Sequence, residues 1–369
     1  MVKMLATIFR TSAGRPQQLS TAVQYNFASL RAFQSSTLNA AIAHPVTAHG
    51  PPPKAPSPSP RFEKCTTQQS NTESEPQHRP RKRPTVLKKR FWKDVDVKQK
   101  DGGDYQVLLD KRPVRTPSKS VLSIPSTKQH LAQAIALEWD VMNAAQQALK
   151  NHTIPLTSLT ARAADIAQED AAGAGAGAGV ERVIRTQIVK TAMRYLETDT
   201  LLCWVPEQDD AVKDEETQQQ ETLREAQMRV AKDVIAFLST KVWPGIDIVP
   251  VLDGNSIFPA SQSQATKDII RQWVEGLEAY DLAGLERGIL ASKSLLVAVR
   301  LVTEWSENFC QLQQLSRKRF GIEEAAEASS LEVRWQTDMW GEVEDTHDVD
   351  KEDLKRQLGS VIVLVAGVQ

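Results

Sequence analysis

The sequence predicts an α+β protein in two parts, a small two-layer unit with an antiparallel sheet followed by an all-α helical bundle. Between residues 91 and 124 apolar and polar side chains alternate and turn residues separate the runs, as in short antiparallel strands. After residue 154 apolar residues recur at the three- and four-residue spacing of helices. With 369 residues, 41% of them apolar, the chain is too long for one compact domain, so we expect two domains and additional tails.

The N-terminal tail has the composition of a mitochondrial targeting segment. Residues 1–61 contain no Asp or Glu, and their Arg and Lys residues lie among Ser, Thr, Ala and Leu. We predict a transit peptide over residues 1–40, with processing near Arg31, and a disordered Pro-rich and basic linker over residues 41–89. Seven basic residues between 79 and 90 could form a nucleic-acid or nuclear-import patch, but their position favours a solvated segment leading into the fold.

The first folded domain is expected over residues 90–152. Apolar residues alternate on both sides of a Gly-containing turn at 101–103, which predicts a hairpin, and the chain up to Ile124 closes a small meander. One face of such a sheet needs a cover. A helix with capping-box spacing at Ser126 and Gln129 follows and is predicted to run to about Leu149. Trp139 lies on its apolar face, where a packing role is favoured over a binding role.

The second domain, residues 153–369, is predicted as a helical bundle. Amphipathic stripes at 184–195, 223–237 and 270–277 predict helices, with long surface connections at 207–221 and 244–263. Residues 282–302 are the most apolar and carry small residues at four-residue spacing, so we predict one central helix closely approached by another backbone. The Ala-Gly run at 171–179 lacks the Gly-Lys-Ser/Thr of a phosphate-binding loop, which favours a low-complexity loop.

Composition excludes several classes of function. The chain has 45 basic and 46 acidic residues, of which residues 1–90 hold 14 and 3. The folded part is therefore acidic and unsuited to binding nucleic acid. Three distant cysteines and scattered histidines form no ligand array, so we predict no metal, no cofactor and no catalytic residue. The apolar run 361–368 is too short to cross a bilayer, so we predict no membrane insertion. Abundant carboxylates still leave an acid/base pair possible.

The C-terminal region combines acid with large apolar side chains. Between Glu323 and Asp353, twelve acidic residues face two basic ones, and Trp335, Met339 and Trp340 are interleaved with them. This pattern fits a solvated helix with a buried apolar side or a docking surface. In a regular helix Glu332 would lie on the small and apolar side, where a carboxylate needs a cationic or hydrogen-bonding partner.

Several motifs, in a shared order, resemble a known family. The resemblance covers roughly residues 90–366 and rests on Arg90-Phe91-Trp92 and on the runs at 109–117, 136–140, 196–201 and 331–347. The family is the mitochondrial assembly chaperone for the catalytic head of ATP synthase, the member that holds the free alpha subunit. The resemblance implies a non-enzymatic matrix protein, a monomer when free, that binds unassembled alpha subunit until beta subunit replaces it.

The resemblance also suggests site residues. The family's functional glutamate falls on Glu332 and its motif tryptophan after the first sheet on Trp139, and we add Trp335 and Trp340 as partner-binding residues because they lie in the acidic segment. Two other classes remain open at this stage. One is a mitochondrial matrix enzyme, hydrolase-like and carboxylate-based, and the other is a structural subunit that stays in its complex.

Overall fold

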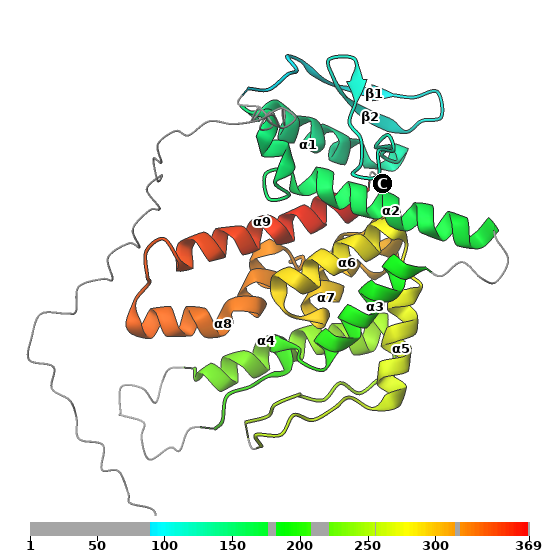
Figure 1. The fold of residues 1–369 in the computed structure, drawn as a ribbon. Coiled ribbons are helices and arrows are strands. Elements are labelled where there is room, and N and C mark those ends of the chain that lie inside the picture. The colour runs from blue at the N-terminus through cyan, green and yellow to red at the C-terminus, as the bar shows by residue number, and fades with distance from the viewer. Residues whose placement is uncertain (1–88, 176–181, 208–220, 255, 314–317, 368–369) are drawn as a thin grey trace, which may run out of the picture. The chain divides into compact units, whose positions relative to one another are not determined.

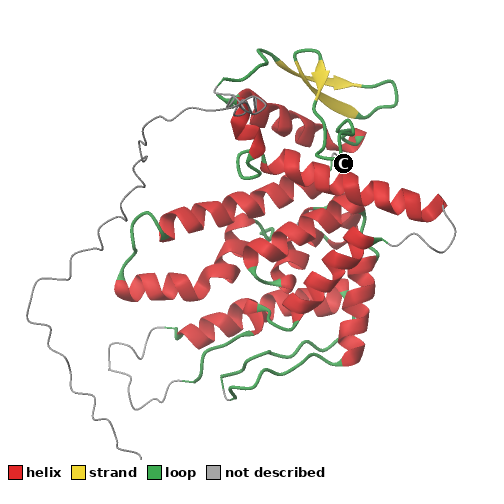
Figure 2. Cartoon of the chain, in the orientation of Figure 1, coloured by secondary structure: helices red, strands yellow, loops and turns green. Residues whose placement is uncertain are grey.

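The computed structural model describes residues 89–175, 182–207, 221–254, 256–313 and 318–367. The predicted transit peptide and nearly all of the predicted linker lie outside these residues. Within the described part, a small sheet with one covering helix is followed by a helical bundle (Figures 1 and 2). The α+β class predicted from the sequence is therefore confirmed.

The sheet is antiparallel and has three strands in the order β1-β2-β3, namely β1 (Val95–Gln99), β2 (Tyr105–Leu109) and β3 (Arg112–Pro113). The hairpin register pairs Val97 with Val107, as alternation predicts. Gly103, at φ 91°, provides the left-handed turn residue between β1 and β2. The predicted meander is closed by single bridges, including Tyr105 to Ile124, and not by a further strand.

Helix α1 (Gln129–Asp140) covers the sheet and contacts β1 and β2, and its Leu131 and Ile135 are buried. It follows a short 3₁₀ helix, η1 (Ser126–Lys128), and has no side-chain cap, so the predicted capping box is wrong. The predicted end near Leu149 is also wrong.

The helix ends at Asp140, and residues Ala145–Leu149 form a separate 3₁₀ helix, η2. The Gln147 side chain accepts hydrogen bonds from the backbone N–H groups of Asn143 and Ala144 at 2.9 and 3.0 Å. These bonds stabilise the break by satisfying backbone donors that a continuous helix would have paired.

The bundle helices are α2 (Pro155–Gly175), α3 (Val183–Leu196), α4 (Leu223–Phe237), α5 (Gln264–Glu275), α6 (Ala279–Ser292), α7 (Leu295–Trp305), α8 (Ile322–Trp340) and α9 (His347–Val365). They confirm the three predicted amphipathic stripes, which lie on α3, on α4 and on α5, the last with Leu277 just beyond its end. The first helix, α2, extends to Gly175, so the start of the Ala-Gly run is helical and not the predicted loop, in keeping with the high helix propensity of alanine. The rest of that run lies outside the described residues. No helix of the described part has the length and apolarity needed to span a membrane.

The predicted central helix over residues 282–302 is two helices, α6 and α7, joined at Lys293, which has φ 59°. Ser294 caps α7 by accepting a hydrogen bond from Val297 N–H. The Asp199 carboxylate accepts another from Leu296 N–H at 3.0 Å. Apolar residues continue on both sides of the turn because both helices are buried, and the polar run Ser292-Lys293-Ser294, with its N-cap serine, is the local sign of the break.

The small residues of α6 do mark close approaches, as predicted. A β-carbon on Gly284 would lie 2.6 Å from Val365 Cγ1 of α9, and one on Gly288 would lie 3.0 Å from Ala298 Cβ of α7. Helix α6 therefore packs closely against two neighbours, and it also contacts α2 and α3. Since α1 contacts both α2 and α9, the predicted domain boundary near residue 152 stays a prediction.

Candidate functional site

Helix α8 has two halves that differ in their surroundings. Its first half is buried through Ala325, Ala326 and Ala328. The backbone then departs from helical geometry at Ser330, at φ −126° and ψ 17°, where the Ser330 hydroxyl donates to the carbonyl oxygen of Ala326 at 2.7 Å. Beyond this kink the helix runs to the connection with α9, and the two form a hairpin whose tip lies at the edge of the bundle (Figure 1).

The tip of this hairpin exposes large apolar side chains. We define the outer patch as Met339, Trp340, Val343 and Val349; Met339 is 66% exposed and Trp340 is 79% exposed. The possibility of a solvated helix with its apolar side buried is therefore wrong at this end, although Trp335 is half-buried. Exposed acidic residues surround the patch in the sequence: Asp338, Glu342, Glu344, Asp345, Asp348 and Asp350. An exposed apolar patch rimmed by a single charge sign is typical of a protein-binding surface.

Glu332 follows the kink, is exposed, and lies beside Ala328 and Ser329, on the small side of α8 that the sequence predicts. Its carboxylate accepts one long hydrogen bond from Gln336 Nε2, at 3.3 Å. Glu332 lines a hollow of about 170 Å³, which we call the Glu332 pocket. The walls come from three elements: η3 (Thr200–Leu202) with the following Cys203, α4 through Gln227 and Val230, and α8 through residues 328–333.

A buried carboxylate supports one wall of the Glu332 pocket. Asp199 is fully buried and accepts hydrogen bonds from the N–H groups of Leu201 and Leu296, both at 3.0 Å, so it fastens η3 to the start of α7. Burial raises the pKa of Asp199 to about 6, although hydrogen bonds to Ser294, Leu296 and Leu201 oppose the shift. The only signal of Asp199 in the sequence is its place in the family-like run 196–201.

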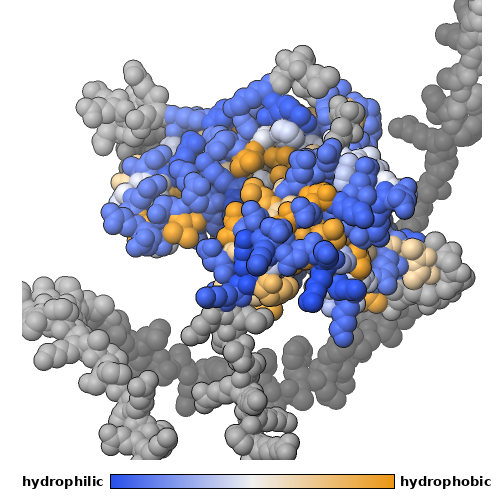
Figure 3. Space-filling model, turned by 90° about the horizontal axis from the view of Figure 1, so that it is seen from above, coloured by the Kyte–Doolittle hydropathy of each residue, from blue (hydrophilic) through white to orange (hydrophobic). Residues whose placement is uncertain are grey.

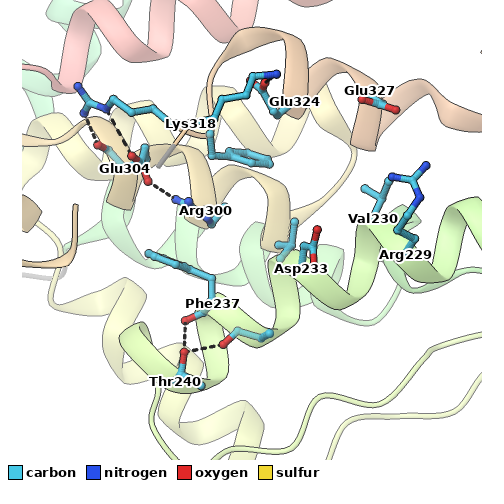
Figure 4. Close-up of a pocket in the computed structure, with 14 residues that line it drawn as sticks. Arg229, Val230, Asp233, Phe237, Thr240, Arg300, Glu304, Lys318, Glu324 and Glu327 are labelled. Carbon is cyan, nitrogen blue, oxygen red and sulfur yellow. Dashed lines mark hydrogen bonds and ion pairs between the residues drawn. The ribbon is translucent and has the colours of Figure 1, made fainter. Parts of the chain in front are cut away.

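A larger hollow of about 550 Å³ is drawn in Figure 4. It adjoins the Glu332 pocket, because Val230 lines both. In its wall the Arg300 guanidinium lies 3.7 Å from the ring centre of Phe237 and donates to Glu304 at 2.6 Å. Glu304 also pairs with Arg319 at 3.3 Å. Burial lowers the pKa of Arg300, and the bond to Glu304 opposes this shift.

Charged groups that line the larger hollow pair with one another within the chain. Its described lining residues include charged pairs, but no histidine and no cysteine, and its buried carboxylate is held between two guanidinium groups. A general base needs a free lone pair within reach of a proton. No group of three or more potential metal ligands occurs in the described part of the chain.

Trp139 lies apart from α8, under the sheet. Its ring contacts Trp92 edge-on at 5.4 Å between centroids, and its indole N–H donates to Thr157 Oγ1 at 3.0 Å. The neighbouring Glu138 carboxylate accepts hydrogen bonds from the first N–H groups of α2, at Leu156 and Thr157. The structure thus places Trp139 in packing between α1 and α2, and brings Trp335, Trp340 and Glu332, but not Trp139, together on one helix.

A second group of exposed apolar side chains lies on α1 and beside it, at Phe91, Leu137 and Val141. Seen from the side of the sheet and α1, apolar residues gather in the middle of a largely hydrophilic face (Figure 3). Arg90 and Asp140 form an ion pair at its margin, at 3.3 Å. Because charges of both signs border this group, it indicates the charge of a binding partner less clearly than the outer patch does.

Comparison with known proteins identifies the class. The profile of the ATP12 chaperone protein family matches residues 89–239. The mitochondrial atp12 protein of Schizosaccharomyces pombe is 30% identical over 277 residues, which cover 75% of this chain and 81% of that protein. The mitochondrial ATP12 protein of Saccharomyces cerevisiae is 28% identical over 282 residues, covering 74% and 82%. A crystal structure from Agrobacterium tumefaciens, described as a candidate chaperone, shares the fold with a TM-score of 0.53 at 20% identity, over 75% of this chain and 85% of that one.

The protein is thus a chaperone and not an enzyme, and the matrix hydrolase considered from the sequence is set aside. The chain belongs to the ATP12 chaperone family. Because the curated relatives are named as mitochondrial proteins, the chain is assigned to the mitochondrion.

Proposed function

We propose that, in the assembly of mitochondrial ATP synthase, this chain binds the unassembled alpha subunit of the catalytic head in the matrix. It shields the apolar interface of that subunit and is displaced by the beta subunit. The single observation that carries this proposal is the outer patch, where Met339 and Trp340 are exposed within an acidic segment of a family chaperone. No cofactor is required.

The physics of the patch suits transient holding. An orphan subunit exposes an apolar interface that aggregates at cellular concentration, and the chaperone must cover it without excluding the final partner. Buried aromatic anchors such as Trp340 carry most of the energy of an interface, while acidic residues steer encounter and determine specificity. Moderate affinity then lets the beta subunit release the client by mass action.

The direct test is to measure light scattering of purified alpha subunit, alone and with the chaperone. Trp340→Ala should weaken binding by roughly ten-fold or more, since truncating an aromatic anchor at an interface costs about 2 kcal/mol. The matched control is Phe258→Ala, which removes an aromatic side chain of nearly equal exposure, 77% against 79%, from the loop between α4 and α5. Equal loss in both variants, or no suppression of scattering by the wild type, would contradict the proposal.

Glu332→Lys provides a second test on the same surface. Charge reversal at an exposed carboxylate should leave the fold intact and reduce capture of the alpha subunit. Glu275→Lys, at the end of α5, is the control, because it reverses an exposed charge away from α8. If Glu332→Lys unfolds or aggregates instead, Glu332 is a structural residue and its assignment to partner binding is wrong.

The remaining parts of the proposal concern stoichiometry and release. We expect the free chaperone to elute as a monomer and to leave the alpha subunit when purified beta subunit is added. Persistence of the chain in finished ATP synthase would favour a structural subunit. Trp139 remains a hypothetical contact residue, and Trp139→Phe, which keeps the ring packing on Trp92, should leave client binding unchanged if its role is packing alone.

A further inference from the structure

The Glu332 pocket has the size of a site for one side chain. Its volume is about 170 Å³, below the roughly 300–1,000 Å³ of pockets that take small-molecule ligands. Apolar groups from three elements form much of its wall, including Leu201, Val230 and Leu331. The carboxylate of Glu332 lines the same hollow and is exposed. An apolar wall with one accessible carboxylate matches the two parts of a long cationic side chain.

The charges around the pocket have one sign. Among the described residues no Lys, Arg or His lies within ion-pair distance of Glu332, and none lines the pocket. Behind the wall, buried Asp199 contributes a second carboxylate. Burial raises the pKa of the Cys203 thiol, and the negative charges of Asp199 and Glu332 raise it further, an effect expected of a thiol in a negative field.

The adjoining hollow shows the opposite arrangement. Its buried Glu304 is bonded to Arg300 and Arg319, and its Glu324 is paired with Lys318 at 2.5 Å. Internal cations thus satisfy those carboxylates, whereas Glu332 faces the solvent with only a neutral amide as partner. The difference points to a cation supplied from outside.

We propose that the Glu332 pocket receives a single lysine or arginine side chain of the bound client. The aliphatic stem packs on Leu201, Val230 and Leu331, and the cationic head meets the carboxylate of Glu332. The pocket confers register and specificity, while the outer patch on the same helix supplies apolar contact. The identity of the client rests on the proposed function; the preference of the pocket for a cation does not.

Cys203 makes the preference measurable without a client, because its thiol lines the pocket and is half-exposed. In the full chain with Cys65→Ser and Cys310→Ser, modification of Cys203 is followed with two methanethiosulfonate reagents of similar size, one carrying an ammonium and one a sulfonate. We expect the cationic reagent to react faster by on the order of ten-fold, since the nearby carboxylates attract one and repel the other. Glu332→Gln should reduce the ratio several-fold, whereas Asp338→Asn, farther along α8, should leave it unchanged.

The same thiol then reports on occupancy. Saturating alpha subunit should slow modification of Cys203 at least several-fold, and Glu332→Gln should weaken both binding and protection. Equal rates for the two reagents overturn the cation preference even if alpha subunit binds, so that failure is distinct from failure of the proposed function. A strong cation preference with no protection by bound alpha subunit overturns the client side chain as the occupant.

Discussion

Helix α7 and the outer half of α8 use apolar residues in opposite ways. Nine of the eleven residues of α7 are buried, and even Glu304 and Thr303 are among them. In α8 beyond the kink at Ser330, only Leu331 is buried, although Val333, Met339 and Trp340 are as apolar as the residues of α7. The first helix finds its partners within the chain. The second leaves apolar side chains exposed, as the proposed partner-binding surface requires.

The acidic residues of the two helices show the same contrast. Glu304 is 1% exposed and is held by two guanidinium groups, because a buried carboxylate is tolerated only when paired. Glu332 is exposed and has no cationic partner among the described residues. A carboxylate that the fold satisfies internally stabilises or specifies the fold, whereas one left open is available for recognition.

The largest expected effect tests whether Glu304, the carboxylate that is paired within the chain, stabilises the fold. Glu304→Ala leaves Arg300, whose side chain is only 12% exposed, without its partner, so we expect a loss of about 3–5 kcal/mol in the free energy of unfolding. Urea denaturation followed by tryptophan fluorescence measures it. Glu332→Ala is the matched control and should stay within about 0.5 kcal/mol of the wild type. Comparable losses in both variants would contradict the division into internal and external carboxylates.

A smaller effect concerns pH. The folded-state pKa of Asp199 is raised from 3.8 to about 6, so between these values the folded state binds more protons than the unfolded state. The stability that protonated Asp199 provides is full below about pH 4 and is lost as pH rises through about 6, by at most about 3 kcal/mol.

The measurement is the free energy of unfolding at several pH values between about 4 and 7. Burial also raises the pKa of Asp281 and Glu138, which contribute with the same sign. The Asp199 contribution is therefore the difference between the wild type and Asp199→Asn, which cannot titrate. An unchanged pH dependence in Asp199→Asn would show that this carboxylate does not couple stability to pH.

Local pattern predicted the elements of the fold better than their ends. Alternation of apolar residues placed β1 and β2, and helical spacing placed α3, α4 and α5. The two errors in helix length, at Asp140 and at Lys293, both lie where side chains bond the backbone: Gln147 in the first case and Ser294 with Asp199 in the second. Ser294 is a local signal, but Asp199 is 97 residues from Leu296, so its support for the break is a contact that a local pattern cannot show.

The candidate site was predictable only in part. Acid interleaved with Trp335 and Trp340 indicated α8 as a recognition element, and the family resemblance indicated Glu332. Helical spacing predicted the small neighbours of Glu332, Ala328 and Ser329, whereas the kink at Ser330 and the exposure of Glu332 had no signal in the sequence. The pocket itself joins α8 to η3 and α4, which are distant in the sequence and have no pattern that links them.

The smallest expected effect on stability tests whether the exposed apolar residues of α8 contribute little to the fold. Met339→Ala removes a side chain that is 66% exposed, so the free energy of unfolding should change by no more than about 0.5 kcal/mol. Leu296→Ala, a truncation of similar size in the buried α7, should cost about 2–5 kcal/mol. Affinity for alpha subunit should respond in the reverse order, falling for folded Met339→Ala and unchanged for folded Leu296→Ala. If Met339→Ala instead destabilised the free chaperone by several kcal/mol, the outer patch would already be covered in solution. A surface that is covered in the free protein is not available to bind a client.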